Sequence, residues 1–420
     1  MKGYHRYIPF IVCSLIICSL SGCGYSEETK GGTGPYAAAA GMEGTPIVDY
    51  TVPQMNPNIL VDLYGYPAEG RKEAAVKGRE LPEGFRLMDS DTGTAVYYGT
   101  VSDITYDQEM GLYLGRVDFS DFTEEGSFYL ECDYIGQSYR FEIEDQYFRK
   151  LFEENYEKLM EECREGTLSV SNAIVLLEAY EWYGEIFPDA DSDQVPDVLS
   201  ELKVWVSHME AAGVEEQETA LYAAFLAKFS YNYQKFDLRY ATDCLKRAST
   251  VFGQVQTTIS KDADSFFALT ELYRATGLNT YRNKILDYKS YFEDNTSYLE
   301  EPEYLYGIMT YMVTRQRVDL EMCDGFMGSL MHRAEEISNR YTDIIHPVTA
   351  RNNGTDDLLK RAVEVSCANY IMNNYQYTNI VEQFLHYLMG TNRDSMNFYE
   401  QDEVRAEYLL LLAQLTANEM

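Results

Sequence analysis

The spacing of hydrophobic residues changes once along the chain, close to residue 146. Between residues 58 and 144, apolar and polar positions alternate in short runs that glycine-containing turns separate. About seven such runs predict the strands of an aligned β-sandwich. The apolar positions of this alternation include Phe85 and Leu87, Val96 and Tyr98, Leu112 and Leu114, and Phe128 and Leu130.

From residue 147 onward the hydrophobic residues recur at helical spacing. Asp237 is placed as an N-cap, Gly277 as a C-cap, and another helix is expected to start at Tyr377 and Thr378. The predicted helices cover residues 147–163, 168–186, 195–211, 216–231, 238–254, 262–275, 279–294, 301–315, 319–340, 355–373, 377–389 and 402–418. Short loops between so many helices indicate an array of helical hairpins, although a helical-repeat solenoid would have the same pattern.

The first residues have the features of an export signal. Lys2 and Arg6 precede an apolar stretch that is too short to span a bilayer, and Leu20-Ser21-Gly22-Cys23 follows it like a bacterial lipobox. We therefore expect residues 1–23 to be a lipoprotein signal peptide and Cys23 to carry the lipid. The alternative is an ordinary cleaved signal peptide with an incidental cysteine.

Residues 24–57 are poor in groups that could form a core, so we expect a flexible linker there. With Cys23 lipidated, the protein would be exported and anchored to the bacterial cell membrane through its lipid, facing outside the cytoplasm.

Charge and cysteine content exclude several classes of protein. The chain has 34 basic and 68 acidic residues, a net charge of −34, which argues against nucleic acid as a partner. The cysteines after residue 23 form no CxxC pair and are odd in number, so we expect buried thiols without a zinc cluster or a full disulfide framework. We expect a monomer with no cofactor and no metal ion.

Specific runs carry a resemblance to a known family. Residues 85–93 and 117–130 closely resemble the immunoglobulin-like module that precedes the catalytic domain in family 9 glycoside hydrolases, the endoglucanase-type cellulases. Residues 169–181, 195–204, 264–277 and 353–392 resemble the helices of that catalytic domain. The resemblance implies an Ig-like β-sandwich at residues 58–146 and an (α/α)6 barrel, the six-hairpin glycosidase fold, at residues 147–420. It also implies β-glucan or a related oligosaccharide as the partner.

Inverting hydrolysis of a glycosidic bond needs a proton-donating carboxylic acid and a carboxylate that activates water. The family takes its base from an Asp-Ala-Gly-Asp motif, and counting back from Ser171 without gaps puts Glu161-Glu162-Cys163-Arg164 at that place. Arg164 would then occupy the position of the base, where a guanidinium cannot accept a proton. Glu161 is the candidate carboxylate on this side of the site, although it also fits the polar face of a helix.

The resemblance assigns the acid to Glu403, within the run Asp402–Glu407. The same residue would also suit the first turn of a helix, where the dipole favours acidic side chains. Trp182 and Trp205 are candidates for stacking on sugar rings, although aromatic residues at helical spacing are usually core.

Two hypotheses follow. Either the protein hydrolyses β-1,4-glycosidic bonds with a rearranged base, or it is a non-catalytic glycan-binding or structural surface protein on a degenerate glycosidase scaffold. The sequence favours engagement of β-glucan and leaves hydrolysis open.

Overall fold

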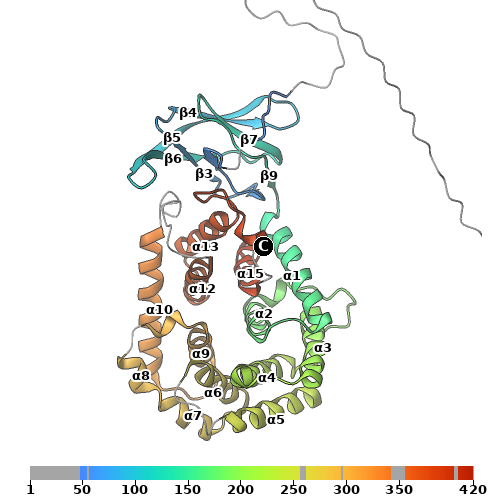
Figure 1. Ribbon diagram of the computed structural model, residues 1–420. Coiled ribbons are helices and arrows are strands. Elements are labelled where there is room, and N and C mark those ends of the chain that lie inside the picture. Colours follow the sequence, from blue (N-terminus) through green and yellow to red (C-terminus); the bar gives the residue numbers. More distant parts are fainter. Residues whose placement is uncertain are drawn as a thin grey trace, which may run out of the picture. The chain divides into compact units, whose positions relative to one another are not determined.

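The computed structural model describes residues 48–53, 56–255, 262–294, 297–341, 355–401 and 405–419. The expected signal peptide, Cys23 and most of the expected linker lie outside these residues, as does Glu403. Within them the chain forms a β-sheet domain followed by a helical domain (Figure 1).

The sheet domain has its strands in the order β1-β3-β6-β5-β4-β7-β9-β2, with β8 paired to β7. Neighbouring strands are antiparallel except for β2 and β9, which are parallel. The strands are β1 (Ile59–Leu60), β2 (Gly65–Pro67), β3 (Glu73–Gly78), β4 (Gly84–Asp89), β5 (Ala95–Asp107), β6 (Leu112–Asp118), β7 (Gly126–Cys132), β8 (Gly136–Gln137) and β9 (Phe141–Glu144).

The long strand β5 joins the two layers of this domain. Its first half pairs with β4 and its second half with β6, and the register shifts between Ser102 and Thr105. Asp103 has a φ of 47° at this irregularity, as expected where a bulge bends a strand.

The alternation of apolar and polar residues predicted the buried face of most strands correctly and that of one strand incorrectly. Phe85, Leu87 and Phe128 are buried as an alternating strand requires, but Val96 and Tyr98 on β5 face solvent, Tyr98 with 71% exposure. The inward residue is Tyr97, which packs against the sandwich core. A shift of one residue exchanges the two faces of a strand, so an apolar alternation alone cannot say which face is inside.

The helical domain confirms the predicted (α/α)6 barrel. Helices of the inner layer are α2 (Val170–Tyr183), α4 (Thr219–Tyr233), α6 (Ala263–Thr276), α9 (Pro302–Val313), α12 (Thr355–Met372) and α15 (Ala406–Glu419). Helices of the outer layer are α1 (Tyr147–Glu165), α3 (Asp197–Ala212), α5 (Leu238–Val255), α7 (Asn279–Leu286), α8 (Lys289–Asp294), α10 (Leu320–Tyr341) and α13 (Tyr375–Leu388). A short helix, α14 (Phe398–Gln401), precedes α15.

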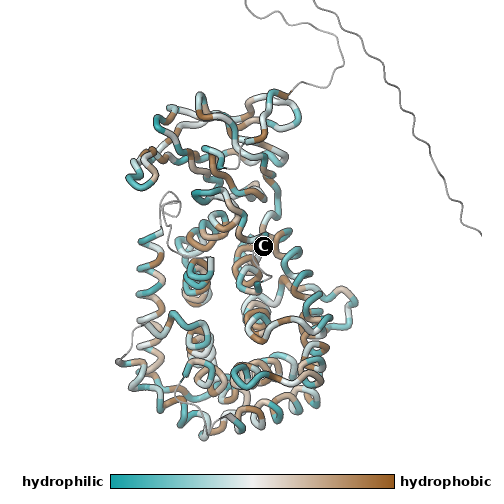
Figure 2. Tube along the Cα trace, viewed as in Figure 1, coloured by the Kyte–Doolittle hydropathy of each residue, from teal (hydrophilic) through white to brown (hydrophobic). Residues whose placement is uncertain are grey.

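Contacts between inner helices close a ring, which excludes the solenoid. Each inner helix contacts the next one in the order α2, α4, α6, α9, α12, α15, and α15 contacts α2 (Figure 1). Figure 2 shows mostly hydrophobic residues along α15, whereas the outer helix α10 alternates between hydrophilic and hydrophobic ones. A helix packed on all sides needs apolar residues around its circumference, while a surface helix needs only one apolar face.

Local capping explains where several helices begin and end. Asp237 accepts from the backbone N–H of Tyr240 at 3.0 Å, and Gly277, with a φ of 68°, closes α6 by donating to the Tyr273 carbonyl.

The predicted start at Tyr377 and Thr378 was two residues late, because the Asn374 side chain caps α13 by accepting from the Gln376 N–H. The helix predicted over 279–294 is two helices, α7 and α8.

The five cysteines among the described residues are free thiols: Cys132, Cys163, Cys244, Cys323 and Cys367. All but Cys323 are buried. In the described part of the chain no helix combines the length and apolarity needed to cross a membrane.

Candidate functional site

The first turns of the inner helices gather at one end of the ring, which we call the N-terminal mouth. A cavity of about 350 Å³ opens there, and its lining includes Ser171 of α2, Phe267 of α6 and Tyr306 of α9. Its charged lining residues are Glu300, Glu301, Glu303, Lys360 and Glu407. Acidic side chains therefore dominate this cavity.

The inner helices α6, α9 and α15 each place an acid of their first turn at this mouth: Asp264, Glu303 and Glu407. Glu303 and Glu407 line the cavity just described, and Asp264 lines a neighbouring one with Asp262. In the order of the ring, α6 and α15 lie opposite each other. Carboxyl groups thus stand on facing sides of the same opening.

The electrostatics of this mouth raise the pKa of two of its carboxyl groups. Burial raises the pKa of Glu303, and the neighbouring charges of Glu301 and Glu407 raise it further. Burial also raises the pKa of Asp264 to about 7, with Glu303, Asp262 and Glu301 contributing. A carboxylic acid that is still protonated near neutral pH can serve as a general acid.

The start of α2 meets, at this mouth, the segment to which the resemblance assigns the acid. The Asn172 side chain, at the start of α2, accepts a hydrogen bond from the backbone N–H of Ala406 at 3.1 Å. Ser171 and Glu407, the neighbours of these two residues, line the same cavity. Glu403 lies outside the described residues, two positions before the described segment resumes at Arg405.

On the base side, the structure places the predicted residues on the surface of α1. Glu161 is exposed on α1, and the residues that line the acidic cavity do not include it. Arg164 forms ion pairs with Glu157 at 2.7 Å and Glu201 at 3.1 Å.

A buried ionic cluster lies between α2, α4 and α6. The Lys228 ammonium, which is 0% exposed, contacts Glu181 at 2.8 Å, Glu178 at 2.9 Å and Glu271 at 3.4 Å. Arg274 also pairs with Glu181 and Glu271. Burial raises the pKa of Glu178 to about 7. The pKa of Glu181 is instead well below its usual value, because Lys228 and Arg274 outweigh the effect of burial.

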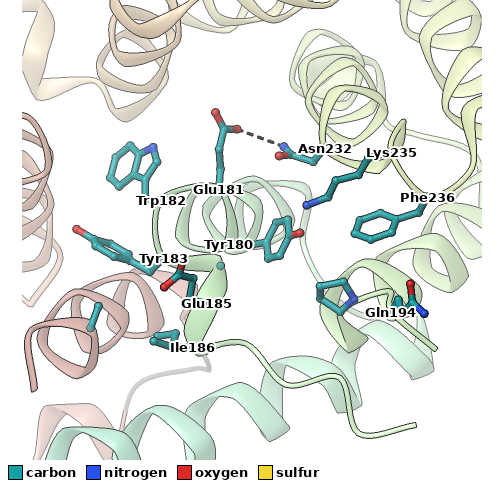
Figure 3. Close-up of a pocket in the computed structure, with 13 residues that line it drawn as sticks. Tyr180, Glu181, Trp182, Tyr183, Glu185, Ile186, Gln194, Asn232, Lys235 and Phe236 are labelled. Atoms are coloured by element: carbon teal, nitrogen blue, oxygen red, sulfur yellow. Dashed lines mark hydrogen bonds between the residues drawn. The ribbon is translucent and has the colours of Figure 1, made fainter. Parts of the chain in front are cut away.

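The opposite end of the ring, the C-terminal mouth, holds a larger cavity of about 660 Å³. Figure 3 shows Trp182 and Tyr183 on one side of it, Asn232, Lys235 and Phe236 on the other, and Glu181 between them. Trp182 therefore lines a cavity, and its role as a sugar-stacking residue stays a prediction.

Trp205 is part of the core. It is 0% exposed, and its indole N–H donates to the Leu168 carbonyl at 2.9 Å. A side chain in this position packs the helices together and does not contact a glycan.

Among the residues that the structure describes, one grouping of acids could approach a metal ion. Asp189 and Asp191 of the loop before α3 and Asp197, its first residue, bring carboxylate oxygens within 4.8 Å of one another. Such oxygens suit Ca²⁺, but the Asp197 carboxylate already accepts from the Ala190 N–H. We assign no metal to this loop.

Sequence reasoning missed Asp264, Glu303 and Glu407 as a group. The available signal was that each is an acid in the first turn of a helix, which is also the ordinary position of a dipole-stabilising residue. Only the closure of the ring shows that these first turns share one mouth.

Comparisons with known proteins agree with this architecture. Residues 54–137 match the family model of the cellulase N-terminal Ig-like domain, and residues 179–400 match that of glycosyl hydrolase family 9. The second match covers more than half of the chain, which therefore belongs to glycosyl hydrolase family 9. No curated protein matched the sequence.

Solved structures of the same family have the same fold. A metagenome-derived family 9 endoglucanase is 14% identical with a TM-score of 0.70, covering 86% of this chain and 98% of its own. A family 9 protein from Bacteroides ovatus is 13% identical with a TM-score of 0.66, covering 86% and 99%. A thermostable endoglucanase from Alicyclobacillus acidocaldarius is 15% identical with a TM-score of 0.60, covering 81% and 83%. At these identities the similarity shows the fold alone.

Proposed function

We propose that this protein binds a β-glucan-type oligosaccharide at the N-terminal mouth and hydrolyses its β-1,4-glycosidic bonds there. The observation that carries the proposal is the pair formed by Glu303 and Glu407, which line one cavity, with the pKa of Glu303 raised by burial and by neighbouring acids. Family membership and the endoglucanases among the solved structures support a glucan as the substrate.

In this mechanism Glu303 is the general acid. It donates its proton to the glycosidic oxygen as the bond from that oxygen to the anomeric carbon breaks. Glu407, from another wall of the cavity, accepts a proton from the water that attacks the opposite face of the sugar ring. Two carboxyl groups separated by space for a water molecule are the requirement for an inverting enzyme.

Export and anchoring complete the proposal. A lipid on Cys23 and a linker over residues 24–57 would hold the barrel at the outside of the cell, where polysaccharide arrives. A polymer too large to enter the cell must be shortened there.

The test is release of reducing ends from carboxymethylcellulose and cello-oligosaccharides. Glu303→Gln should lower the rate by about 10²–10⁴-fold, the usual contribution of a general acid, and Glu407→Gln should have a similar effect. Glu161→Gln, on the exposed face of α1, is the matched control and should retain the wild-type rate. Glu403→Gln tests the assignment that the resemblance makes.

Dependence on pH gives a second readout. Because the pKa of Glu303 is raised, the acid remains protonated at a higher pH than an ordinary glutamate would, and the rate should fall as pH rises through that pKa. Activity that is unchanged in Glu303→Gln and Glu407→Gln would contradict these roles.

Arg164 favours a second candidate function, that of a non-catalytic glycan-binding protein. By ungapped counting it occupies the place of the family base, and its guanidinium is engaged by Glu157 and Glu201. Measurable binding of cello-oligosaccharides without any release of reducing ends would favour this alternative over the hydrolase.

A further inference from the structure

We infer that the C-terminal mouth of the barrel is a second oligosaccharide-binding site, one that holds a neutral glucan chain without cleaving it. It lies at the opposite ends of the inner helices from the acidic cavity, and only the choice of glucan as the sugar rests on the proposed function. The cavity of about 660 Å³ has roughly twice the volume of the acidic cavity, and falls within the ~300–1,000 Å³ typical of ligand pockets.

The aromatic wall of this cavity is held in place by stacking. The Trp182 ring lies on the Tyr370 ring with centroids 4.8 Å apart and planes at 16°, and Tyr183 contacts both rings edge-on. Trp182 is only partly buried, and Tyr370 is 38% exposed. Because the rings support one another, a flat apolar face is available at little cost in side-chain entropy.

Polar side chains beside and across from this wall can bind sugar hydroxyls. The Glu181 carboxylate is fixed by Lys228 at 2.8 Å and by the Asn232 amide at 3.2 Å (Figure 3). A carboxylate has about four acceptor sites, so it can still accept from a hydroxyl. Lys235, whose ammonium lies over the Phe236 ring at 4.7 Å, supplies donors from the same side.

The charges around the cavity favour a neutral ligand over an anionic one. Glu181 is already compensated by Lys228 and Arg274, and the remaining charged lining residues, Lys235 and Glu185, have opposite signs. An anionic sugar would gain one cation and face two carboxylates.

The same electrostatics argue for binding without cleavage. Glu181 stays ionised because of Lys228 and Arg274, so it cannot donate a proton. The neighbouring acid with a raised pKa, Glu178, is 1% exposed and does not line the cavity. An acid that the ligand cannot reach cannot protonate a glycosidic oxygen.

Tryptophan fluorescence tests the site directly, since the chain has two tryptophans and Trp205 is 0% exposed. Cellotetraose should change the emission of Trp182 and protect it from quenching by acrylamide, and Trp182→Phe should remove this response. By calorimetry, Trp182→Ala and Lys235→Ala should each weaken this binding about tenfold, through loss of ring stacking or of a donor. Lys246→Ala, at an exposed lysine of α5, should bind as wild type does.

Binding at the C-terminal mouth and hydrolysis at the N-terminal mouth can be measured separately. Glu303→Gln should lose product release yet retain the Trp182 response, and an inactive wild-type protein should still show that response. A Trp182 signal that does not respond to millimolar cellotetraose would overturn the inference, as would wild-type affinity in both Trp182→Ala and Lys235→Ala. Binding of oligogalacturonate in place of cellotetraose would overturn the neutral class of ligand.

Discussion

Lys228 shows how a single buried residue can hold the barrel together. Its ammonium is 0% exposed and contacts three carboxylates, Glu178, Glu181 and Glu271, from two neighbouring inner helices. Thr310 of α9 also donates to Glu271 at 2.7 Å, so the cluster links α2, α4, α6 and α9. A buried charge group of this kind is stable only while its members compensate one another.

Replacing Lys228 should therefore be strongly destabilising. Lys228→Met keeps most of the side-chain volume but leaves three carboxylates with Arg274 alone, so we expect a loss of about 3–5 kcal/mol in the free energy of unfolding. Urea denaturation measures the change, with Lys246→Met on the surface of α5 as the control. A loss below about 1 kcal/mol, the range of an exposed pair, would mean that the cluster is not closed as described.

His386 connects the helical domain to the sheet domain. Its ring Nδ1 lies 2.7 Å from the Asp62 carboxylate, and its Nε2 lies 3.6 Å from Glu382. Tyr147 also donates to Asp62, at 3.1 Å. Although burial alone would lower it, the two carboxylates raise the pKa of His386 to about 9.

Stability should consequently decrease on the alkaline side. A histidine whose folded pKa lies above its unfolded value of 6.5 stabilises the fold fully below that unfolded value, and the contribution is lost as pH rises through about 9. The melting temperature should therefore fall between pH 6.5 and pH 9, and His386→Gln should flatten this dependence. His332→Gln, on the exposed side of α10, should keep the wild-type profile, and an equally steep profile in His386→Gln would assign the effect to other groups.

At the scale of the element, Asp262 has two separable roles at the start of α6. Its side chain caps the helix by accepting from the Ser265 N–H at 2.8 Å, and its charge helps to raise the pKa of Asp264. Asp262→Ala should lower the free energy of unfolding by about 1 kcal/mol through loss of the cap.

Asp262→Asn should separate these roles, because asparagine caps a helix nearly as well as aspartate but carries no charge. We expect near-wild-type stability together with a pKa of Asp264 below its present value, read from the carboxyl resonance by NMR. Equal destabilisation by the two variants would mean that the charge, and not the cap, is what stabilises α6.

Elements could be predicted from the sequence where a single local signal decides them. Gly277 and Asp237 marked their helix ends correctly, because capping depends only on neighbouring residues. The face of β5 was assigned wrongly at Val96 and Tyr98, because the alternation is the same on either face and the partner strand decides.

The site was less predictable than the fold, because it depends on tertiary contacts between distant parts of the sequence. Asp264, Glu303 and Glu407 are spread over more than 140 positions of sequence, and only the ring of inner helices brings their first turns to one mouth. Trp182 and Trp205 look alike at helical spacing, yet one lines a cavity and the other is core. A side chain that points into the ring is distinguished from one that packs between helices only by tertiary contacts.

At the scale of the whole molecule, the two mouths of the barrel would have different functions on the same glucan chain. The N-terminal mouth would cleave the glucan, and the C-terminal mouth would keep the chain bound. Both sites would act on polymer outside the cell. Retention by Trp182 raises the local concentration of substrate only if the protein itself stays at the cell surface. The lipid anchor is therefore the part of the proposal on which the use of both sites depends.

Cys23→Ser tests that anchor. Without the thiol no lipid can be attached, so the variant should lose incorporation of labelled palmitate and move from the membrane fraction to the soluble fraction, since a net charge of −34 gives the rest of the chain no attraction to an anionic bilayer. Cys18→Ser, five positions earlier in the apolar stretch, is the matched control and should remain labelled and membrane-bound. If the wild-type protein is released without label, Cys23 is incidental, residues 1–23 are an ordinary signal peptide, and the barrel acts as a secreted protein.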